Sequence, residues 1–187
     1  MDPGFLDLVE LQPVFNDGSN NAGNSCQVSD GAGSVLLMKR SIAMQKGLPI
    51  LGVFRTFTII GVDPAIMGVD PAAAILAIVK VVGLELGDIG LFEINEAFAS
   101  QFVPCPNKLE LDLEKFNVNG HATSAHCGAT QLHEMKRHGK GCRFGVITMC
   151  VGSTMGVVFV LERGMLLMTS ATLGSSKQVF YLRMQAL

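Results

Sequence analysis

The chain has 187 residues, of which 49% are hydrophobic and only 16% are charged, and its formal net charge is −2. A mean hydropathy of +0.40 excludes a disordered chain, because disorder requires low hydrophobicity. The near-neutral charge disfavours nucleic-acid binding, which needs a basic surface to neutralise phosphates. The length suffices for one domain, or for one domain with part of another.

Cysteine usage and the first residues bear on the cellular compartment. The five cysteines lie at irregular spacings without a Cys-x-x-Cys pair, so we expect reduced intracellular thiols, no disulfide framework and no metal site. The first residues, MDPGFLDLVELQ, are acidic and lack a basic segment followed by an apolar core. This pattern predicts neither a signal peptide nor a transit peptide.

The first part of the chain predicts alternating strands and helices. Residues 16–34 are rich in Gly, Asn and Ser, which is typical of a loop. We expect a short buried strand at Val35–Met38, a helix at Lys39–Lys46 that ends at Gly47, and a long strand at Pro49–Val62.

The clearest predicted helix is Pro71–Val82. Asp70 stands at the N-cap position, and Gly83 follows the last turn. The apolar residues of this helix surround nearly its whole circumference, so we expect burial on all sides.

A buried strand is predicted at Leu91–Ile94, followed by a helix at Asn95–Phe102. Pro104 and Pro106 break the pattern after that helix. A second loop, rich in Gly, Asn, Ser and His, is expected at 117–130.

After a short helix at Gln131–His138, the segment Phe144–Leu161 contains 18 residues without a charge. A membrane helix is one interpretation of this segment. Its β-branched residues and glycines favour two buried strands instead, Phe144–Cys150 and Val157–Leu161, around a turn. The order of elements predicts a layered α/β domain with a mixed sheet. Beyond Gly164 no clear period is present, and we expect a poorly ordered tail.

Three segments place chemically active residue types at predicted strand ends. Asn95 can aim its amide at a ligand, or it can simply cap the following helix. His121 and His126 share one loop, where a histidine can supply a base or be merely solvated. Cys150 precedes Gly152, so it is either a reactive thiol beside backbone amides or a buried structural cysteine.

Taken in order, these segments resemble the C-terminal half of the thiolase family, in particular the peroxisomal type of 3-ketoacyl-CoA thiolase. The matching motifs lie within residues 11–163 and are AGNSCQVSDGAGSVLL, GLPILGVFRTFTIIGVDPAIMGVDPA, FEINEAFASQ and MKRHGKGCRFGVITMCVGSTMG. The resemblance implies a layered α/β fold with a mixed five-stranded sheet. It divides the chain into a remnant of the loop and N-terminal domain at 1–47, a C-terminal domain at 48–163 and an unrelated tail at 164–187.

The resemblance also implies an activity, namely thiolytic cleavage of 3-ketoacyl-CoA to acetyl-CoA and a shortened acyl-CoA in fatty-acid β-oxidation. CoA is then a co-substrate, and no cofactor is bound permanently. In this family a nucleophilic Cys of the N-terminal half attacks the substrate, and a His activates that Cys. A second Cys exchanges a proton with the acetyl-CoA carbanion. By position, Cys150 takes the proton-transfer role, His126 that of the base, and Asn95 holds a water in an oxyanion hole.

Three further residues are implied to contact substrate or CoA. Gly152 offers a backbone amide to a second oxyanion hole, and Met67 lines the acyl or pantetheine channel. Cys26 stands where the family has a CoA-contacting Ser. The resemblance implies no metal site.

The sequence departs from the family pattern at several places. Ala125 and Cys127 flank His126 where the family has Gly and Pro, and His121 is the alternative histidine because it follows a Gly. Thr154 stands where the family has Gly. The segment that carries the family's nucleophilic Cys has no counterpart in the chain, so we expect the chain alone to be inactive.

Two other interpretations stay open. The chain can be a non-catalytic thiolase-like module that only associates with a partner chain. The chain can also be a small cysteine hydrolase, whose site would pair His126 with Cys127 or Cys26 with Ser25.

The thiolase resemblance also implies a set of partners. We expect an acyl-CoA substrate, and either a homo-oligomer or association with a thiolase N-terminal half. A peroxisomal location is expected, and neither nucleic acid nor a membrane is an expected partner.

Overall fold

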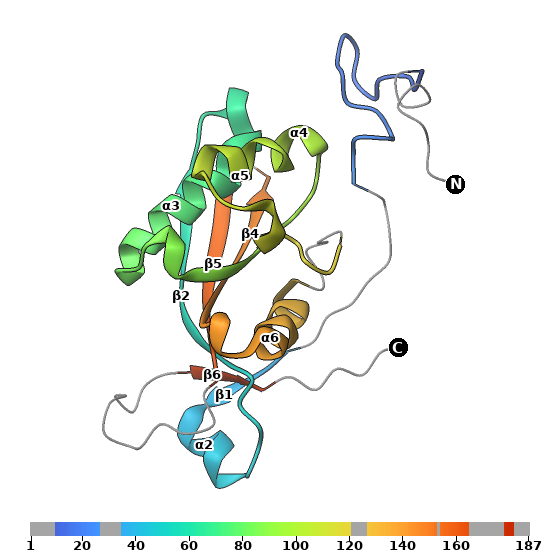
Figure 1. Cartoon of the computed structure of the whole chain (residues 1–187). Helices are drawn as coiled ribbons and strands as arrows, with labels where there is room; N and C mark the ends of the chain where they lie inside the picture. The colour runs from blue at the N-terminus through green and yellow to red at the C-terminus, as the bar shows by residue number, and fades with distance from the viewer. Residues whose placement is uncertain (1–9, 27–34, 121–126, 153, 165–177, 182–187) are drawn as a thin grey trace.

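The computed structural model describes residues 10–26, 35–120, 127–152, 154–164 and 178–181 (Figure 1). Its central layer is a sheet of six strands among these residues, in the order β1-β6-β2-β5-β4-β3. The strands are β1 (Leu36–Lys39), β2 (Gly52–Gly61), β3 (Ile89–Ile94), β4 (Phe144–Val151), β5 (Met155–Arg163) and β6 (Gln178–Tyr181). β3 and β4 are parallel, whereas the other neighbouring strands are antiparallel. The predicted α/β fold with a mixed sheet is therefore confirmed.

The strand count differs from the predicted five because part of the tail joins the sheet. Residues 178–181, which we expected to lie in a poorly ordered tail, form β6 between β1 and β2. β1 is the edge strand beyond it, and Leu36 and Leu37 are 48% and 47% exposed there. The prediction of a buried first strand is therefore wrong, because an edge strand keeps side chains in water.

The strand pair in the uncharged segment is confirmed. β4 and β5 form a hairpin in which Phe144 pairs with Glu162 and Val151 pairs with Met155. A membrane helix over this segment is therefore wrong. No helix in the described part of the chain is both long and apolar enough to cross a membrane. β2 runs along β5, but it begins at Gly52, later than predicted.

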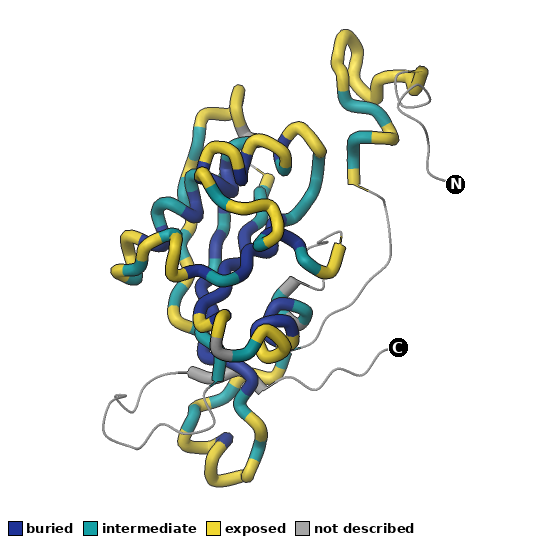
Figure 2. The backbone as a smooth tube through the Cα atoms, viewed as in Figure 1, coloured by how far each residue is buried: buried dark blue, intermediate teal, exposed yellow. Residues whose placement is uncertain are grey.

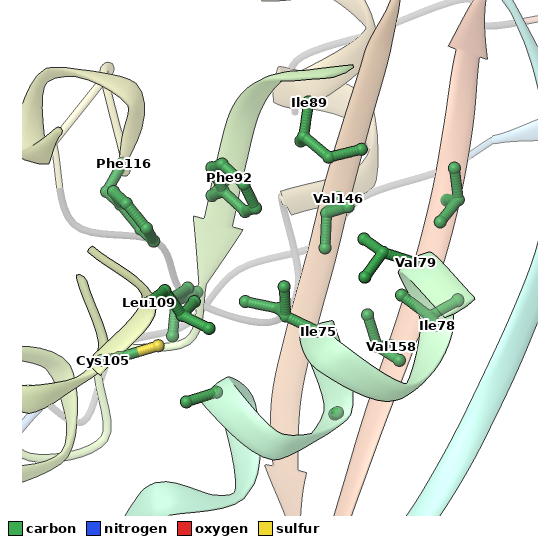
Figure 3. Close-up of a cluster of buried hydrophobic side chains, with 14 of the residues drawn as sticks. Ile75, Ile78, Val79, Ile89, Phe92, Cys105, Leu109, Phe116, Val146 and Val158 are labelled. Atoms are coloured by element: carbon green, nitrogen blue, oxygen red, sulfur yellow. The ribbon is translucent and has the colours of Figure 1, made fainter. Parts of the chain in front are cut away.

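Helix α3 (Asp70–Val82) covers one face of the sheet over β2, β5 and β4. Its residues Ile75 and Ile78 are fully buried in a cluster with Val146 (Figure 3). Burying one such side chain contributes about 1.5–3 kcal/mol. The opposite side of α3 reaches solvent, and Val81 is 63% exposed. The expected burial on all sides is wrong because α3 forms an outer layer.

Asp70 does not cap α3 as predicted. It is the first helical residue, and Val69 occupies the N-cap position. The carboxyl group of Asp70 is fully buried, and neither of its oxygens has a hydrogen-bond partner among the described residues. Burial raises the pKa of this carboxyl above its ordinary value. Gly83 ends the helix with a left-handed φ of 66°, as the sequence predicts.

The helix predicted at Asn95–Phe102 is shorter than expected, because residues 95–98 are not helical and α4 (Ala99–Phe102) begins only after them. Phe98 has extended backbone and pairs with Ser25 in an isolated bridge. A further helix, α5 (Pro104–Leu109), starts at a proline rather than being prevented by it. Proline is tolerated there because the amide it lacks has no partner in the first turn of a helix.

Helix α6 (Cys127–His138) covers the other face of the sheet, against β4 and β3. It begins before the predicted Gln131, so part of the expected loop at 117–130 is helical. Gly145 of β4 permits the close approach, because a Cβ at that position would lie 2.7 Å from the Met135 Sδ. A side chain at position 145 would therefore force the Gln131 and Met135 side chains of α6 to shift.

The remaining elements are short. They are α2 (Arg40–Gln45) and the 3₁₀ helices η1 (Pro64–Val69), η2 (Leu86–Asp88), η3 (Leu113–Lys115) and η4 (Gly139–Gly141). α2 matches the predicted helix, which ends before Gly47 at φ 62°. Buried residues follow the central strands and the inner sides of α3 and α6, while α2 and the segment 10–26 are mostly exposed (Figure 2).

Candidate functional site

Asn95 and Cys150 lie at the carboxyl ends of two adjacent parallel strands, β3 and β4. Ile94 pairs with Thr148 at the end of β3. The backbone amide of Asn95 then donates a hydrogen bond to the Thr148 carbonyl at 3.0 Å, just before Cys150 in β4. Ligand sites of α/β sheets commonly lie outside the carboxyl ends of parallel strands.

The thiol of Cys150 has a specific partner. Its Sγ donates to Oε1 of Gln101 on α4, across 3.8 Å. Cys150 is half-buried, whereas Gln101 is only 3% exposed. The thiol is therefore reachable from outside on one side and held by an amide on the other.

Two other cysteines are sealed in the core. Cys105 is 3% and Cys142 is 1% exposed, and each belongs to a hydrophobic cluster. Burial raises the pKa of Cys105 to about 12 and that of Cys142 to about 11. Cys105 and Cys142 are therefore buried structural cysteines with unreactive thiols. Cys150 belongs to neither hydrophobic cluster.

The turn after Cys150 joins β4 to β5. Gly152 lies in this turn and is exposed. Thr154 follows with a left-handed φ of 63°, and its carbonyl accepts a hydrogen bond from the Val62 amide at 3.0 Å. Gly156 pairs with Cys150 across the hairpin, and a Cβ there would lie 2.9 Å from the Asp70 carbonyl oxygen. The turn is thus fixed against both β2 and α3.

Met67 lies in η1, which packs against α4. The next residue, Gly68, approaches the Cα of Gln101, at 3.8 Å from the position that a Cβ would take. The backbone of η1 therefore lies beside the residue that holds Cys150. The side chain of Met67 is outside the described part of the chain.

The N-terminal segment reaches the same region through its backbone. The Cys26 amide donates to the Ala97 carbonyl at 2.8 Å, and the Ala99 amide donates to the Asn24 carbonyl at 2.9 Å. Cys26 itself is exposed. The predicted CoA-contact position therefore lies beside the segment that follows Asn95.

The histidine loop cannot be placed, because His121 and His126 lie outside the described residues. The choice between them stays as the sequence left it, and so does the hydrolase pairing of His126 with Cys127. At the other hydrolase candidate, Ser25 Oγ donates to the Asn21 carbonyl at 2.8 Å.

The sequence analysis did not single out two residues that contact the candidate site, Gln101 and Asn117. The Oδ1 of Asn117 accepts from the Ile94 amide at 2.8 Å, and its Nδ2 donates to the Ile94 carbonyl at 2.9 Å. The same Nδ2 donates to the Glu96 carboxylate. Asn117 thereby fixes the backbone on which Asn95 sits. Asn117 adopts a left-handed φ of 45°, which Asn tolerates better than most residues, but in the sequence it is simply one more Asn of a predicted loop.

A buried acid lies beneath this region. Glu93 of β3 is 3% exposed, and its Oε1 has no hydrogen-bond partner among the described residues. Burial, reinforced by the charges of Glu134 and Glu96, raises the pKa of Glu93 to about 7. Glu134 behaves differently: burial acts to raise its pKa, but Arg137 and other donors outweigh burial and lower it.

Comparison with known proteins places this architecture in a family. The C-terminal domain model of thiolase matches residues 48–163, and the N-terminal domain model matches residues 5–41. The chain belongs to the thiolase family.

Named relatives and solved structures agree with this assignment. The chain is 67% identical over 167 residues to 3-ketoacyl-CoA thiolase 1, peroxisomal, of Arabidopsis thaliana, a match that covers 84% of this chain and 38% of the relative. It is 49% identical over 165 residues to 3-ketoacyl-CoA thiolase B, peroxisomal, of Mus musculus, covering 83% and 39%. The chain thus spans well under half the length of these relatives.

Among solved structures, the dimeric peroxisomal thiolase of Saccharomyces cerevisiae matches with a TM-score of 0.73 and 40% identity, over 85% of this chain and 42% of that one. The acetyl-CoA acetyltransferase of Bacillus anthracis matches with a TM-score of 0.75 and 36% identity, over 87% and 43%. Human mitochondrial 3-ketoacyl-CoA thiolase, solved with CoA, matches with a TM-score of 0.69 and 30% identity, over 83% and 42%.

Proposed function

We propose that this chain supplies the proton-transfer half of a 3-ketoacyl-CoA thiolase site, with Cys150 as its thiol. One observation carries the proposal: Cys150 is half-buried at the end of β4 with its Sγ on Gln101, while Asn95 follows the adjacent parallel strand. The relatives named 3-ketoacyl-CoA thiolase support 3-ketoacyl-CoA as the substrate class. The human structure with CoA supports CoA as the co-substrate.

The proton balance of thiolysis defines what Cys150 does. Cleavage breaks the bond between the α and β carbons, and the acyl group passes to the nucleophilic thiolate of the missing motif. The electron pair stays on the α carbon of acetyl-CoA, and the Cys150 S–H gives that carbon its proton. The resulting thiolate accepts the proton of the incoming CoA thiol, whose sulfur takes the acyl group. Cys150 thus ends the cycle protonated again.

The other implied residues act around this thiol. Asn95 holds the water that completes one oxyanion hole with His126, and Gly152 gives an amide to the second. Met67 lines the channel for the acyl chain or pantetheine, and Cys26 contacts CoA. Support for Met67 and Cys26 comes from backbone placement, because η1 packs on α4 and Cys26 pairs with Ala97.

We further propose that the 187-residue polypeptide taken alone does not carry out thiolysis. None of its residues matches the family's nucleophilic motif, and Cys150 cannot replace it without vacating the proton-transfer role. Catalytic groups that act as a unit are strongly non-additive, so loss of the nucleophile removes nearly the whole effect.

The partner that would complete the site is the rest of a thiolase N-terminal domain. Phe57 and Ile59 of β2 are each 53% exposed on the sheet face that carries α6, and Phe159 lies beside Phe57 with ring centroids 6.2 Å apart. We call these three residues the β2–β5 patch. Exposed apolar patches favour association. The N-terminal domain is the proposed occupant because its family model matches residues 5–41 alone, and the chain covers 38% of the length of the Arabidopsis relative.

Mixing experiments test both claims. Acetoacetyl-CoA consumption in the presence of CoA is measured for the chain alone and for the chain mixed with the N-terminal half of the Arabidopsis relative. We expect no turnover alone, turnover in the mixture, and its loss in Cys150→Ala. Turnover by the chain alone, or turnover that survives Cys150→Ala, would overturn the proposal.

A non-catalytic module is the second candidate, and the β2–β5 patch is the observation that favours it. In that case the same mixture forms a complex by light scattering but shows no turnover.

For location we propose the peroxisome, as the names of the relatives state for them. Immunofluorescence tests this location: the signal of an antibody against the chain should coincide with that of a peroxisomal marker.

A further inference from the structure

The side-chain amide of Gln101 carries both an acceptor, Oε1, and a donor, Nε2, and either of them can face the sulfur of Cys150. Oε1 of Gln101 accepts from the Cys150 Sγ at 3.8 Å, within the range of sulfur hydrogen bonds. The other end of the same amide, Nε2, is buried and has no partner among the described residues. A buried amide N–H₂ without a partner is unfavourable and calls for an explanation.

The backbone of Gln101 is fixed, although its amide end is not. Its N–H donates to the Phe98 carbonyl at 3.0 Å within the turn that opens α4. On the other side lies η1, where a Cβ at Gly68 would come within 3.8 Å of the Gln101 Cα and Cβ. A half-turn about the last side-chain bond would therefore exchange Oε1 for Nε2 at the sulfur, and it would sacrifice no described hydrogen bond of Nε2.

We propose that Gln101 is a positioning residue that stabilises both protonation states of Cys150 by rotating its amide. This inference rests on the proposed proton-transfer role of Cys150. When the thiol is protonated, Oε1 accepts its S–H. When the proton has left, Nε2 turns to the sulfur and donates to the thiolate. No proton passes through Gln101. Its amide dipole only turns to suit the neutral thiol or the negatively charged thiolate of Cys150.

Alkylation of the full chain by iodoacetamide tests the inference, with the rate at each cysteine read by peptide mass spectrometry between pH 6.5 and 9.5. In Gln101→Met, which keeps the length but removes both polar atoms, we expect Cys150 alkylation at pH 8 to slow about tenfold. Hydrogen bonds to a charged group are the stronger ones, so the thiolate loses more than the thiol does. Gln101→Glu should slow it further, because a carboxylate has no donor and repels a thiolate.

Gln131 provides the matched control, because it is also a buried glutamine but donates its Nε2 to the Leu91 carbonyl under α6. Gln131→Met should leave the alkylation profile of Cys150 unchanged. Cys26 serves as the internal reference in every variant, because it is exposed.

Two results would overturn the inference. One is a Cys150 profile in Gln101→Met that matches that of the unaltered chain. The other is faster alkylation of Cys150 together with Cys105 and Cys142, since a merely loosened fold exposes all three thiols. The experiment needs neither CoA nor turnover, so a failed thiolysis mixture refutes the proposed function without touching this result.

Discussion

Thr154 and Val62 join the β4–β5 turn to the end of β2. The Val62 amide donates to the Thr154 carbonyl at 3.0 Å, and Thr154 makes this contact from a left-handed backbone with φ 63°. That conformation costs an L-residue about 1–2 kcal/mol, and a β-branched residue adopts it rarely. The family resemblance places Gly at this position, so the chain carries strain where its relatives' pattern avoids it.

Replacing Thr154 by Gly should stabilise the fold. Relief of the left-handed strain is worth about 1–2 kcal/mol, and the extra freedom of Gly in the unfolded chain takes back about 0.5–1 kcal/mol. We expect a net gain of about 0.5–1 kcal/mol in the free energy of unfolding, measured by urea titration. Thr154→Val keeps the branched Cβ and should show no gain. A destabilised Thr154→Gly chain would contradict the strain argument.

Glu93 should make stability fall as the pH rises through neutrality. Its pKa is raised from 4.5 to about 7, first by burial and then by Glu134 and Glu96. Between these two values the unfolded chain has lost the proton and the folded chain keeps it, so the stabilisation is complete below about pH 4.5 and is lost as the pH rises through 7. The shift corresponds to about 3 kcal/mol at pH 8.

Glu93→Gln should remove this dependence. We expect the variant to be more stable than the unaltered chain by about 1–3 kcal/mol at pH 8, with a difference near zero at pH 4.5, by urea unfolding at both pH values. Glu114→Gln, at an exposed position of η3, is the control and should change little. An equal effect of Glu93→Gln at both pH values would show that charge is not its cause.

How far the sequence predicts this fold depends on the kind of contact that decides each element. The strand Phe144–Cys150 and the helix Pro71–Val82 follow from local periodicity and a terminal Gly, and both are present. The non-helical backbone at 95–98 does not follow, because Ser25, with which Phe98 pairs, is distant in sequence. β6 likewise depends on pairing with β1 and β2, and no local sequence pattern predicts that pairing.

The candidate site shows the same division. Cys150 and Asn95 stand out because Cys150 lies near the end of one apolar strand and Asn95 directly follows another, and the structure puts these strands side by side. Gln101 gave no such signal, since a single Gln in a short helix is ordinary on a solvated surface. Only the tertiary packing of α4, which lies against η1 and leaves Gln101 3% exposed, turns that residue into the partner of a thiol.

The four cysteines whose side chains the structure describes should react with iodoacetamide in a fixed order. Cys26 is exposed and should react first, and Cys150, half-buried, should follow. With the pKa of Cys105 at about 12 and that of Cys142 at about 11, these two thiols are almost wholly protonated at pH 8 as well as buried. We expect them to react at least about a hundredfold more slowly than Cys26, because the thiolate is the reacting form.

Time-resolved labelling at pH 8 with peptide mass spectrometry measures this order, and labelling in 8 M urea is the reference in which the rates should converge. Native-state labelling of Cys105 or Cys142 at the rate of Cys26 would show that the described core is open in solution.

The β2–β5 patch should control association of the chain. Phe57 and Ile59 are each 53% exposed, and a lysine at either position projects into solvent without disturbing the buried side of β2. We expect Phe57→Lys with Ile59→Lys to lower the mass seen by light scattering and to weaken complex formation with a thiolase N-terminal half. Val81→Lys with Leu113→Lys is the matched control, because these residues are 63% and 58% exposed but lie outside the patch. A lysine weakens association only where it replaces an apolar contact between chains. If the Val81→Lys, Leu113→Lys variant loses its association and the Phe57→Lys, Ile59→Lys variant keeps it, the chain associates through a surface other than the β2–β5 patch.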